Sequence, residues 1–225
     1  MTARIVGAGS GLSASLLRQL TAAGQECHIV SRGGARSADV VAETGATQHL
    51  IDATDTPAIQ ALIEGLPGRL DIAIYNPSAR VRGPLIDLNP DDVRHAIEVT
   101  AHGAFVMGQA AAKRMLAQEG AVKGTILFTG ASAGVKGFPK SAPFAMGKFA
   151  QRGLAESMAR ELHPQGIHVA WINIDGAIAQ DGRSPSVPDG HLDPEAIATA
   201  YLGLWRQDRS AWSHELSLRP WVETF

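Results

Sequence analysis

The chain is poor in cysteine, in aromatic residues and in excess charge of either sign. Its single cysteine, Cys27, excludes an internal disulfide and any metal cluster held by cysteines. The 20 Lys and Arg residues nearly balance 22 Asp and Glu, so the basic footprint of a nucleic-acid-binding protein and a polybasic patch for lipid are both missing. No apolar run approaches the roughly 20 residues of a membrane span. We therefore expect neither a nucleic-acid partner nor a membrane partner.

The composition predicts a packed core. Hydrophobic residues make up 45% of the 225 residues and charged residues 19%, which is typical of a folded protein. The first residues, MTARIVGAGSG, reach glycines too early for the apolar centre of a signal peptide, so we expect a cytoplasmic protein. The sequence contains no repeat, low-complexity tract or linker. We therefore expect residues 1–225 to form a single domain.

Short apolar segments alternate with segments of helical length. The expected strands are nearly continuous in apolar residues, as is typical of strands buried on both faces: 3–7, 26–32, 46–52, 70–76, 124–130 and 166–175. The expected helices are 11–23, 36–44, 56–65, 90–118 and about 142–162. Asn89 and Pro90 are typical of a helix start. This alternation predicts an α/β fold of the doubly wound, Rossmann type, a parallel sheet with helices on both faces.

Two segments near the end of the chain lack a clear pattern. Residues 177–194 include GRSPSVPDG and are long for a loop in a compact domain, so they form either a functional loop or a plain surface excursion. Residues 206–225 hold two of the four tryptophans. We expect this tail to pack on the domain or on a partner subunit.

A glycine-rich turn follows the first expected strand and precedes a helix. Gly7, Gly9 and Gly11 allow a tight turn whose backbone N–H groups approach a phosphate at the helix N-terminus. The spacing G-x-G-x-x-G is not met, because Leu12 stands where the last glycine should be. The turn instead reads G-x-x-x-G-x-S, with Ser13 as its last residue.

With Ser13 in place of a final glycine, this turn resembles the G-x-x-x-G-x-G of the short-chain dehydrogenase/reductase family. Other segments resemble the same family in the same order: Asp52-Ala53, Asn76, Gly103 with Phe105, ILFTGASAG, FAMGK and INIDGAI. The last of these has Asp175 where the family has proline. The resemblance covers nearly all of residues 1–180 and implies a nicotinamide cofactor and a small-molecule substrate.

The end of the second strand bears on the choice of cofactor. A carboxylate there would bond the ribose 2′-OH of NAD, whereas an arginine would pair with the 2′-phosphate of NADP. This chain has Ser31 and Arg32, with Arg36 nearby and no acid. Because a guanidinium donates two parallel hydrogen bonds to a phosphate, we expect NADP, with NAD possible; the alternative is that Arg32 is a solvated loop residue. The resemblance implies cofactor contacts from Gly7, Gly9, Ser10, Gly11, Leu12, Ser31, Arg32, Asp52, Ala53, Asn76, Lys148, Gly176 and Ile178.

The motif FAMGK departs from the family pattern Tyr-x-x-x-Lys at its first residue. The resemblance implies a tyrosine hydroxyl that exchanges a proton with the substrate, and Phe144 stands at that position, whereas Lys148 is kept. The family's serine position falls on Ala131, with Ser132 adjacent, and its helix asparagine position falls on Thr100. General acid–base help is worth roughly 10²–10⁴ in rate. We therefore expect a poor standard dehydrogenase unless another group takes over.

Five side chains are candidates for the missing chemistry: Ser132, Ser141, Thr100, His102 and Tyr75. We select Ser132 as the hydroxyl that polarises the substrate and Lys148 as the retained catalytic residue. Tyr75 is expected in the core, and His102 at an interface or on the surface.

Two functional hypotheses remain. The first is an NAD(P)-dependent oxidoreductase acting on a carbonyl or alcohol, with altered catalytic residues; the second is a non-catalytic NADP-binding sensor or oligomer partner. Arg80 and Arg82 either line the substrate pocket and favour an acidic substrate or are solvated surface residues. By the resemblance, residues 177–194 form a substrate lid. No metal site is expected, and a homodimer or homotetramer is expected to form through the helices at about 90–118 and 142–162.

Overall fold

A parallel sheet organises the chain in the computed structural model, which describes residues 2–6, 11–35, 37–180 and 182–223. Within these residues seven strands have the order β3-β2-β1-β4-β5-β6-β9, and every neighbouring pair is parallel. The strands are β1 Thr2–Val6, β2 Glu26–Ser31, β3 Thr47–Leu50, β4 Leu70–Tyr75, β5 Gly124–Thr129, β6 Ile167–Ile174 and β9 Glu215–Leu218. A separate parallel pair joins β7 Ala177–Ile178 to β8 His191–Leu192. The predicted doubly wound α/β fold is confirmed.

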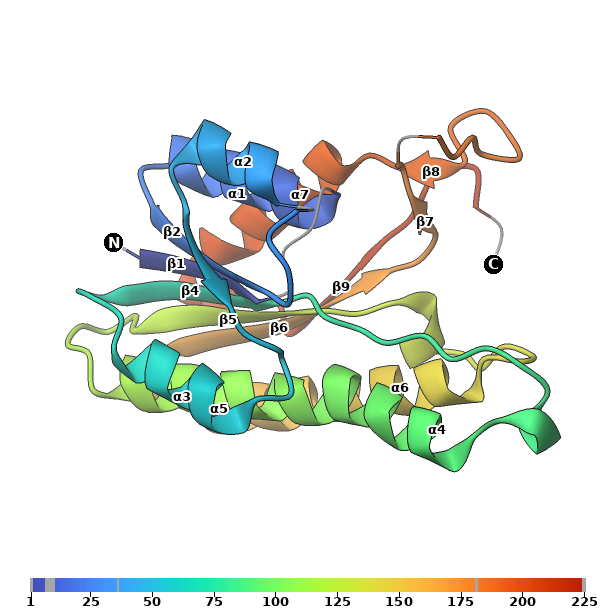
Figure 1. Ribbon diagram of the computed structural model, residues 1–225. Helices are drawn as coiled ribbons and strands as arrows, with labels where there is room; N and C mark the ends of the chain where they lie inside the picture. The colour runs from blue at the N-terminus through green and yellow to red at the C-terminus, as the bar shows by residue number, and fades with distance from the viewer. Residues whose placement is uncertain (1, 7–10, 36, 181, 224–225) are drawn as a thin grey trace.

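Helices cover both faces of the sheet (Figure 1). One layer contains α1 Leu12–Ala22, α2 Ala38–Thr44 and α7 Pro194–Trp205; the other contains α3 Thr56–Glu64, α4 Pro90–Ile97, α5 Gly103–Leu116 and α6 Ala142–Leu162. Successive side chains of β4 enter opposite cores: Ile72 and Ile74 pack with α1 and α7, whereas Ala73 and Tyr75 pack with α3 and α5. This alternation explains why apolar residues run almost without interruption along the central strands.

The long helix predicted at 90–118 is interrupted by a π-helical turn, Glu98–His102, between α4 and α5. Side chains from neighbouring elements donate to carbonyl groups of this turn. The Tyr75 hydroxyl donates to the Val99 carbonyl, and Gln151 Nε2 donates to the Thr100 carbonyl at 3.2 Å. These contacts stabilise the wider turn, which a short-range sequence pattern does not reveal.

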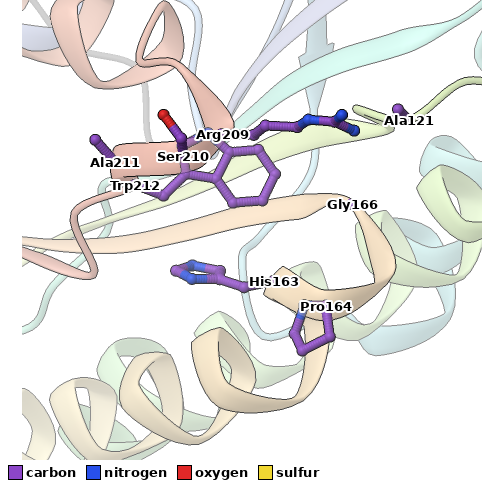
Figure 2. Close-up of a pocket in the computed structure, with 8 residues that line it drawn as sticks. All are labelled: Ala121, His163, Pro164, Gly166, Arg209, Ser210, Ala211 and Trp212. Atoms are coloured by element: carbon purple, nitrogen blue, oxygen red, sulfur yellow. The ribbon is translucent and has the colours of Figure 1, made fainter.

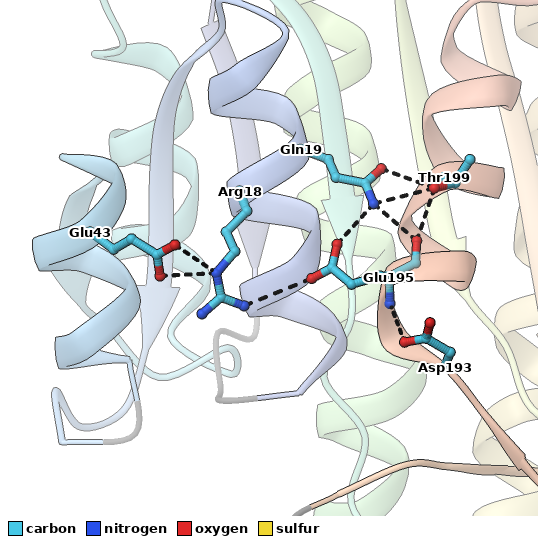
Figure 3. A network of polar contacts seen from close by, with 6 residues as sticks. All are labelled: Arg18, Gln19, Glu43, Asp193, Glu195 and Thr199. Atoms are coloured by element: carbon cyan, nitrogen blue, oxygen red, sulfur yellow. Dashed lines mark hydrogen bonds and ion pairs between the residues drawn. The ribbon is translucent and has the colours of Figure 1, made fainter.

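Helix α7 begins at Pro194, the last residue of the candidate lid 177–194, and it is hydrogen-bonded to α1, the first helix of the fold. Asp193 caps α7 by accepting from the Glu195 N–H at 3.0 Å. Figure 3 shows Gln19 of α1 donating to both the backbone and the carboxylate of Glu195, at 2.9 and 3.0 Å, while Arg18 pairs with Glu43 of α2 at 2.9 Å. The C-terminal end of segment 177–194 is therefore held on the α1–α2 layer.

The C-terminal tail packs on its own chain, because β9 extends the sheet beside β6. Two ion pairs hold it: Arg152 of α6 bonds Glu215 at 2.9 Å, and Arg219 bonds Asp175 at 3.2 Å. Asp175, which replaces a proline of the family motif, thus gains a partner in the tail. Among the described residues, no helix combines the length and apolarity that crossing a bilayer requires.

Replacing Asp175 by Asn should lower the free energy of unfolding by about 1–3 kcal/mol, because it removes the charge that compensates the partly buried Arg219. Urea unfolding measures the change. Glu156→Gln is the matched control, since the Glu156–Arg160 pair is on the surface of α6, where solvent screens it, and its loss should change the free energy of unfolding much less. Equal effects of the two substitutions would contradict the proposed anchoring of the tail.

Candidate cofactor cleft and active site

A pocket of about 850 Å³ lies where β2, β3 and β4 end at the carboxyl edge of the sheet. It is lined by Ser31 and Arg32 after β2, by Asp52 and Ala53 after β3, and by Pro77 to Val81 after β4. Parallel α/β sheets bind ligands at this edge, near the point where the strand order reverses. Here the reversal lies at β1, between β2 and β4. The structure therefore brings together the residues predicted from β2 and β3.

Asp52 is held in a fixed orientation. Its Oδ1 accepts from the backbone N–H of Thr54 at 2.9 Å and from the Thr54 hydroxyl at 2.8 Å. Partial burial acts to raise the pKa of Asp52, but the two Thr54 hydrogen bonds, with Arg32 and His95, outweigh it and lower the pKa. The carboxylate is thus charged near neutral pH and available as an acceptor in the pocket.

Ser31 has a partner that the sequence analysis missed. Gln48 of β3 donates to the Ser31 hydroxyl at 3.0 Å and to the Ser37 hydroxyl at 2.7 Å. The amide therefore joins the end of β2 to the start of α2 and fixes the wall of the pocket beside Arg32. Among the described residues, no carboxylate lies within 4.0 Å of the Arg32 guanidinium. Arg36 lies outside the described residues.

The glycine turn is described only from Gly11 onward, so Gly7, Gly9 and Ser10 lie outside the described residues. The Gly11 carbonyl accepts from the Ala14 N–H at 2.9 Å as α1 begins at Leu12. Ser13, at the family's glycine position, is buried, and its hydroxyl accepts from Asn76 Nδ2 at 2.7 Å. A glycine could not make this bond, which joins α1 to the segment after β4.

Lys148 is buried in the core rather than exposed in the pocket. It is only 2% accessible, and its Nζ donates to the Thr129 carbonyl at 2.5 Å and to Gln151 Oε1 at 3.3 Å. Burial, with a further effect from the charge of Arg80, lowers the pKa of Lys148 to about 7. The same Gln151 oxygen accepts from the Trp171 indole at 3.3 Å. Gln151 is a second polar residue that the motif comparison missed, although it lies one turn after Lys148 on α6.

Phe144 is buried, and a guanidinium covers its ring. The Arg80 Cζ lies 4.5 Å from the ring centroid, a cation–π distance. Ser132 begins a short 3₁₀ turn, Ser132–Gly134, that packs on α6: a Cβ on Gly134 would lie 3.2 Å from the Lys148 carbonyl. Ser132 is partly exposed and Lys148 is on the adjacent helix, so the two residues selected as catalytic lie in the same region of the fold.

Of the other candidates for proton transfer, Thr100 and Tyr75 are held in hydrogen bonds within the core. Thr100 is fully buried, and its hydroxyl accepts from the Ala79 N–H at 3.1 Å. Tyr75 is fully buried and donates to the Val99 carbonyl, and burial raises its pKa far above the ordinary value, as expected for a core residue. His102 is exposed and lies beside Phe105. Ser141 is buried at the residue before α6.

The residue before segment 177–194, Gly176, has a backbone conformation and close neighbours that favour glycine. Gly176 has φ of +154°, and a Cβ there would lie 2.8 Å from Pro220 and 3.0 Å from Leu192. Ile178 pairs with Leu192 where β7 meets β8, which closes the segment at its base. Within the loop, Arg183 pairs with Gln180 in an isolated bridge. The loop therefore has a structured base, and Gly176 and Ile178 position it after β6.

A second pocket, of about 430 Å³, lies at the other end of β6, beside Gly166. Figure 2 shows Trp212 and His163 there, with Arg209 extending from the same tail segment. The Trp212 ring stacks on His168 at 5.0 Å, and His168 Nε2 bonds the Ser213 carbonyl at 2.8 Å. These contacts anchor the tail and are separated from the 850 Å³ pocket by the length of the strand.

A profile described as short chain dehydrogenase matches residues 1–182, most of the chain. The chain belongs to the short chain dehydrogenase family. The family expected from the glycine turn, Asp52, Asn76 and the FAMGK motif is therefore confirmed.

Curated relatives share this family assignment at moderate identity. The short chain dehydrogenase is 31% identical over 190 residues to the cyclic-di-GMP-binding biofilm dispersal mediator protein of Escherichia coli K12, covering 83% of this chain and 77% of the relative. It is 33% identical over 123 residues to human 17-beta-hydroxysteroid dehydrogenase type 1, where the match covers 54% of this chain and only 37% of the relative.

Solved structures of short chain dehydrogenases have the same fold. A short-chain dehydrogenase from Rhodopseudomonas palustris is 32% identical, with a TM-score of 0.84 and 98% coverage of both chains. A metagenomic short-chain oxidoreductase in complex with NADP is 24% identical, with a TM-score of 0.84 and coverage of 99% of this chain and 98% of that one. A second neighbour, solved in complex with NADPH, is 23% identical with a TM-score of 0.83 and coverage of 97% of this chain and 93% of that one.

Proposed function

We propose that the protein is an NADP-dependent oxidoreductase acting on a carbonyl or alcohol, with altered catalytic residues. The observation that carries this proposal is the pocket at the carboxyl edge, where Ser31, Arg32, Asp52 and Ala53 meet in a chain of this family. No acidic residue lies between the end of β2 and the start of α2, and Arg32 has no carboxylate partner among the described residues. These groups suit a nucleotide that carries a 2′-phosphate.

Each part of the pocket has a distinct task in this proposal. Arg32 and Ser31 hold the 2′-phosphate, Asp52 and Ala53 contact the adenine, and the turn that ends at Gly11 and Leu12 faces the pyrophosphate. Asn76, fixed by Ser13, supports the wall next to that turn. For Lys148 to hold the nicotinamide ribose, its ammonium must exchange the Thr129 carbonyl for ribose hydroxyls.

The chemistry in this proposal relies on positioning more than on a protein acid. The bound nicotinamide would supply or accept the hydride. The Ser132 hydroxyl would polarise the substrate oxygen, and the proton would come from water because Phe144 has no titratable group. Turnover would consequently be slow by comparison with a tyrosine-containing site.

The second candidate, a non-catalytic NADP-binding protein, has its own support. Thr100, at the asparagine position, is engaged by the Ala79 N–H, and the Arg80 guanidinium covers the Phe144 ring. Thr100 is fully buried and Phe144 has no titratable proton, so these two positions offer no group that exchanges a proton with solvent. A homodimer or homotetramer is proposed for both candidates, because Phe105 of α5 and Met146 and Phe149 of α6 are 44%, 52% and 45% exposed.

Titration of the protein with NADPH and NADH, followed by nicotinamide fluorescence, tests the cofactor proposal. We expect NADPH to bind more tightly, and Arg32→Gln to weaken NADPH about 10- to 100-fold with little change for NADH, because a charge-assisted phosphate contact is lost. Arg209→Gln, on the tail at the opposite edge of the sheet, is the control. An Arg32 variant that binds NADPH as tightly as the natural protein would contradict the 2′-phosphate assignment, and absence of binding by either nucleotide would reject the proposed function.

A further inference from the structure

Two backbone hydrogen bonds hold residues 79–83, which follow β4, near the start of α6. The Ala79 N–H donates to the Thr100 hydroxyl at 3.1 Å, and the Gly83 N–H donates to the Lys140 carbonyl at 3.2 Å. Arg80 and Arg82 lie between these two bonds. Their backbone is therefore held by contacts to the π-helical turn and to the loop that leads into α6, even though both side chains are exposed.

The Arg80 guanidinium is oriented by stacking and not by a carboxylate. Its Cζ lies 4.5 Å from the Phe144 ring centroid, so one face of the planar group is covered. A stacked guanidinium keeps its N–H groups at the edge, where they can donate in pairs to a carboxylate or phosphate. Among the described residues, no carboxylate lies within 4.0 Å of Arg80, Arg82 or Arg183.

Several cations meet near Phe144. Arg80 remains accessible to solvent but loses part of its hydration, and this effect, with the charges of Arg82 and Arg183, lowers its pKa; the charge of Arg80 contributes to the lowered pKa of Lys148. Arg183 belongs to segment 177–194, so the charges that act on Arg80 come both from its own segment and from the loop after β6. Like charges gathered without a counter-charge destabilise a protein and favour an anionic ligand.

We propose that Arg80, stacked on Phe144 and flanked by Arg82 and Arg183, binds a carboxylate or phosphoryl group of the substrate. This inference rests on the proposed function, because it places the substrate beside the residue at the tyrosine position. Arg80 supplies the paired hydrogen bonds, Arg82 adds charge at the rim, and Arg183 reaches the anion from the loop. The substrate is thus an anionic carbonyl or alcohol compound.

Isothermal calorimetry with matched acids and esters tests this site. The probes are pyruvate, benzoylformate and phenylpyruvate, each compared with its neutral methyl ester, together with phenyl phosphate; each is titrated with and without saturating NADP⁺. We expect at least one anion to bind about 10- to 100-fold more tightly than its neutral counterpart. Arg80→Gln should remove that preference, Arg82→Gln should reduce it, and added salt should weaken it.

Arg206→Gln is the matched control, since Arg206 also lies over an aromatic ring, with its Cζ 5.7 Å from the Trp205 centroid, but it is on α7's C-terminal end. It should leave anion binding unchanged. The inference is overturned if the acids bind no better than their esters and phenyl phosphate does not bind. It is also overturned if Arg80→Gln weakens the binding of NADP⁺ and leaves the binding of the anions unchanged, because Arg80 would then belong to the cofactor site. Anion binding without nucleotide binding would reject the proposed function and support the anion site.

Discussion

Replacing Phe144 by Tyr should increase the rate of NADPH-dependent carbonyl reduction by about 10²–10⁴-fold, the usual contribution of a positioned general acid. The substitution adds a hydroxyl to a ring that lies 4.5 Å from the Arg80 guanidinium and one helical turn before Lys148. The Arg80 guanidinium favours the phenolate and would lower the pKa of the new phenol. The measurement is the decrease of NADPH absorbance with an anionic 2-oxo acid as substrate.

Phe149→Tyr is the control for this experiment, because it places the same hydroxyl on the same helix at an exposed position. Its rate should equal that of the natural protein. If hydride transfer occurs only in the Phe144 variant, the natural protein is a binder; if the natural protein already consumes NADPH slowly, it is an enzyme. A Phe144→Tyr variant that binds NADPH but gains no rate would contradict the placement of Phe144 at the catalytic position.

Replacing Lys148 by Met should abolish a rise in stability between about pH 7 and pH 10.5. Burial lowers the pKa of Lys148 from 10.5 to about 7 in the folded protein. Between these values the unfolded chain binds the proton and the folded chain does not, so the free energy of unfolding increases with pH. The slope can reach about 1.4 kcal/mol per pH unit, and below pH 7 it disappears because both states are protonated.

Urea midpoints measured across this pH range give the difference between the natural protein and the variant. Lys113→Met, an exposed lysine of α5, is the control and should keep the pH dependence. Met fills the space of the lysine stem without a charge, so the core should remain packed. A Lys148→Met variant with the same pH dependence as the natural protein would show that the ammonium is not buried as described.

The local pattern of the chain was sufficient for most elements of the sheet and its helices. Apolar runs placed β2, β4, β5 and β6 within about two residues, and α6 was predicted at its observed bounds, 142–162. The elements after β6 were missed, namely β7, β8, α7 and β9. Helix α7 begins at Pro194, the last residue of the segment predicted as a loop, and β9 is four residues long. A strand this short is stable only because it pairs with β6, and a local sequence pattern does not show pairing with a distant strand.

The candidate site also contains residues that the sequence predicted and contacts that only the structure reveals. The family resemblance and the end of the second strand assigned Asp52 and Arg32 to one cofactor site, and both line the same pocket because the parallel strands before them end together. The burial of Lys148 on Thr129, the bond between Ser13 and Asn76, and the stacking of Arg80 on Phe144 join residues that are 19, 63 and 64 positions apart. The sequence by itself therefore determined the family, the fold and the end of the sheet where the candidate site lies. Only the tertiary structure decided which polar groups are engaged and which cations lack a partner, because these contacts depend on packing between elements distant in the chain.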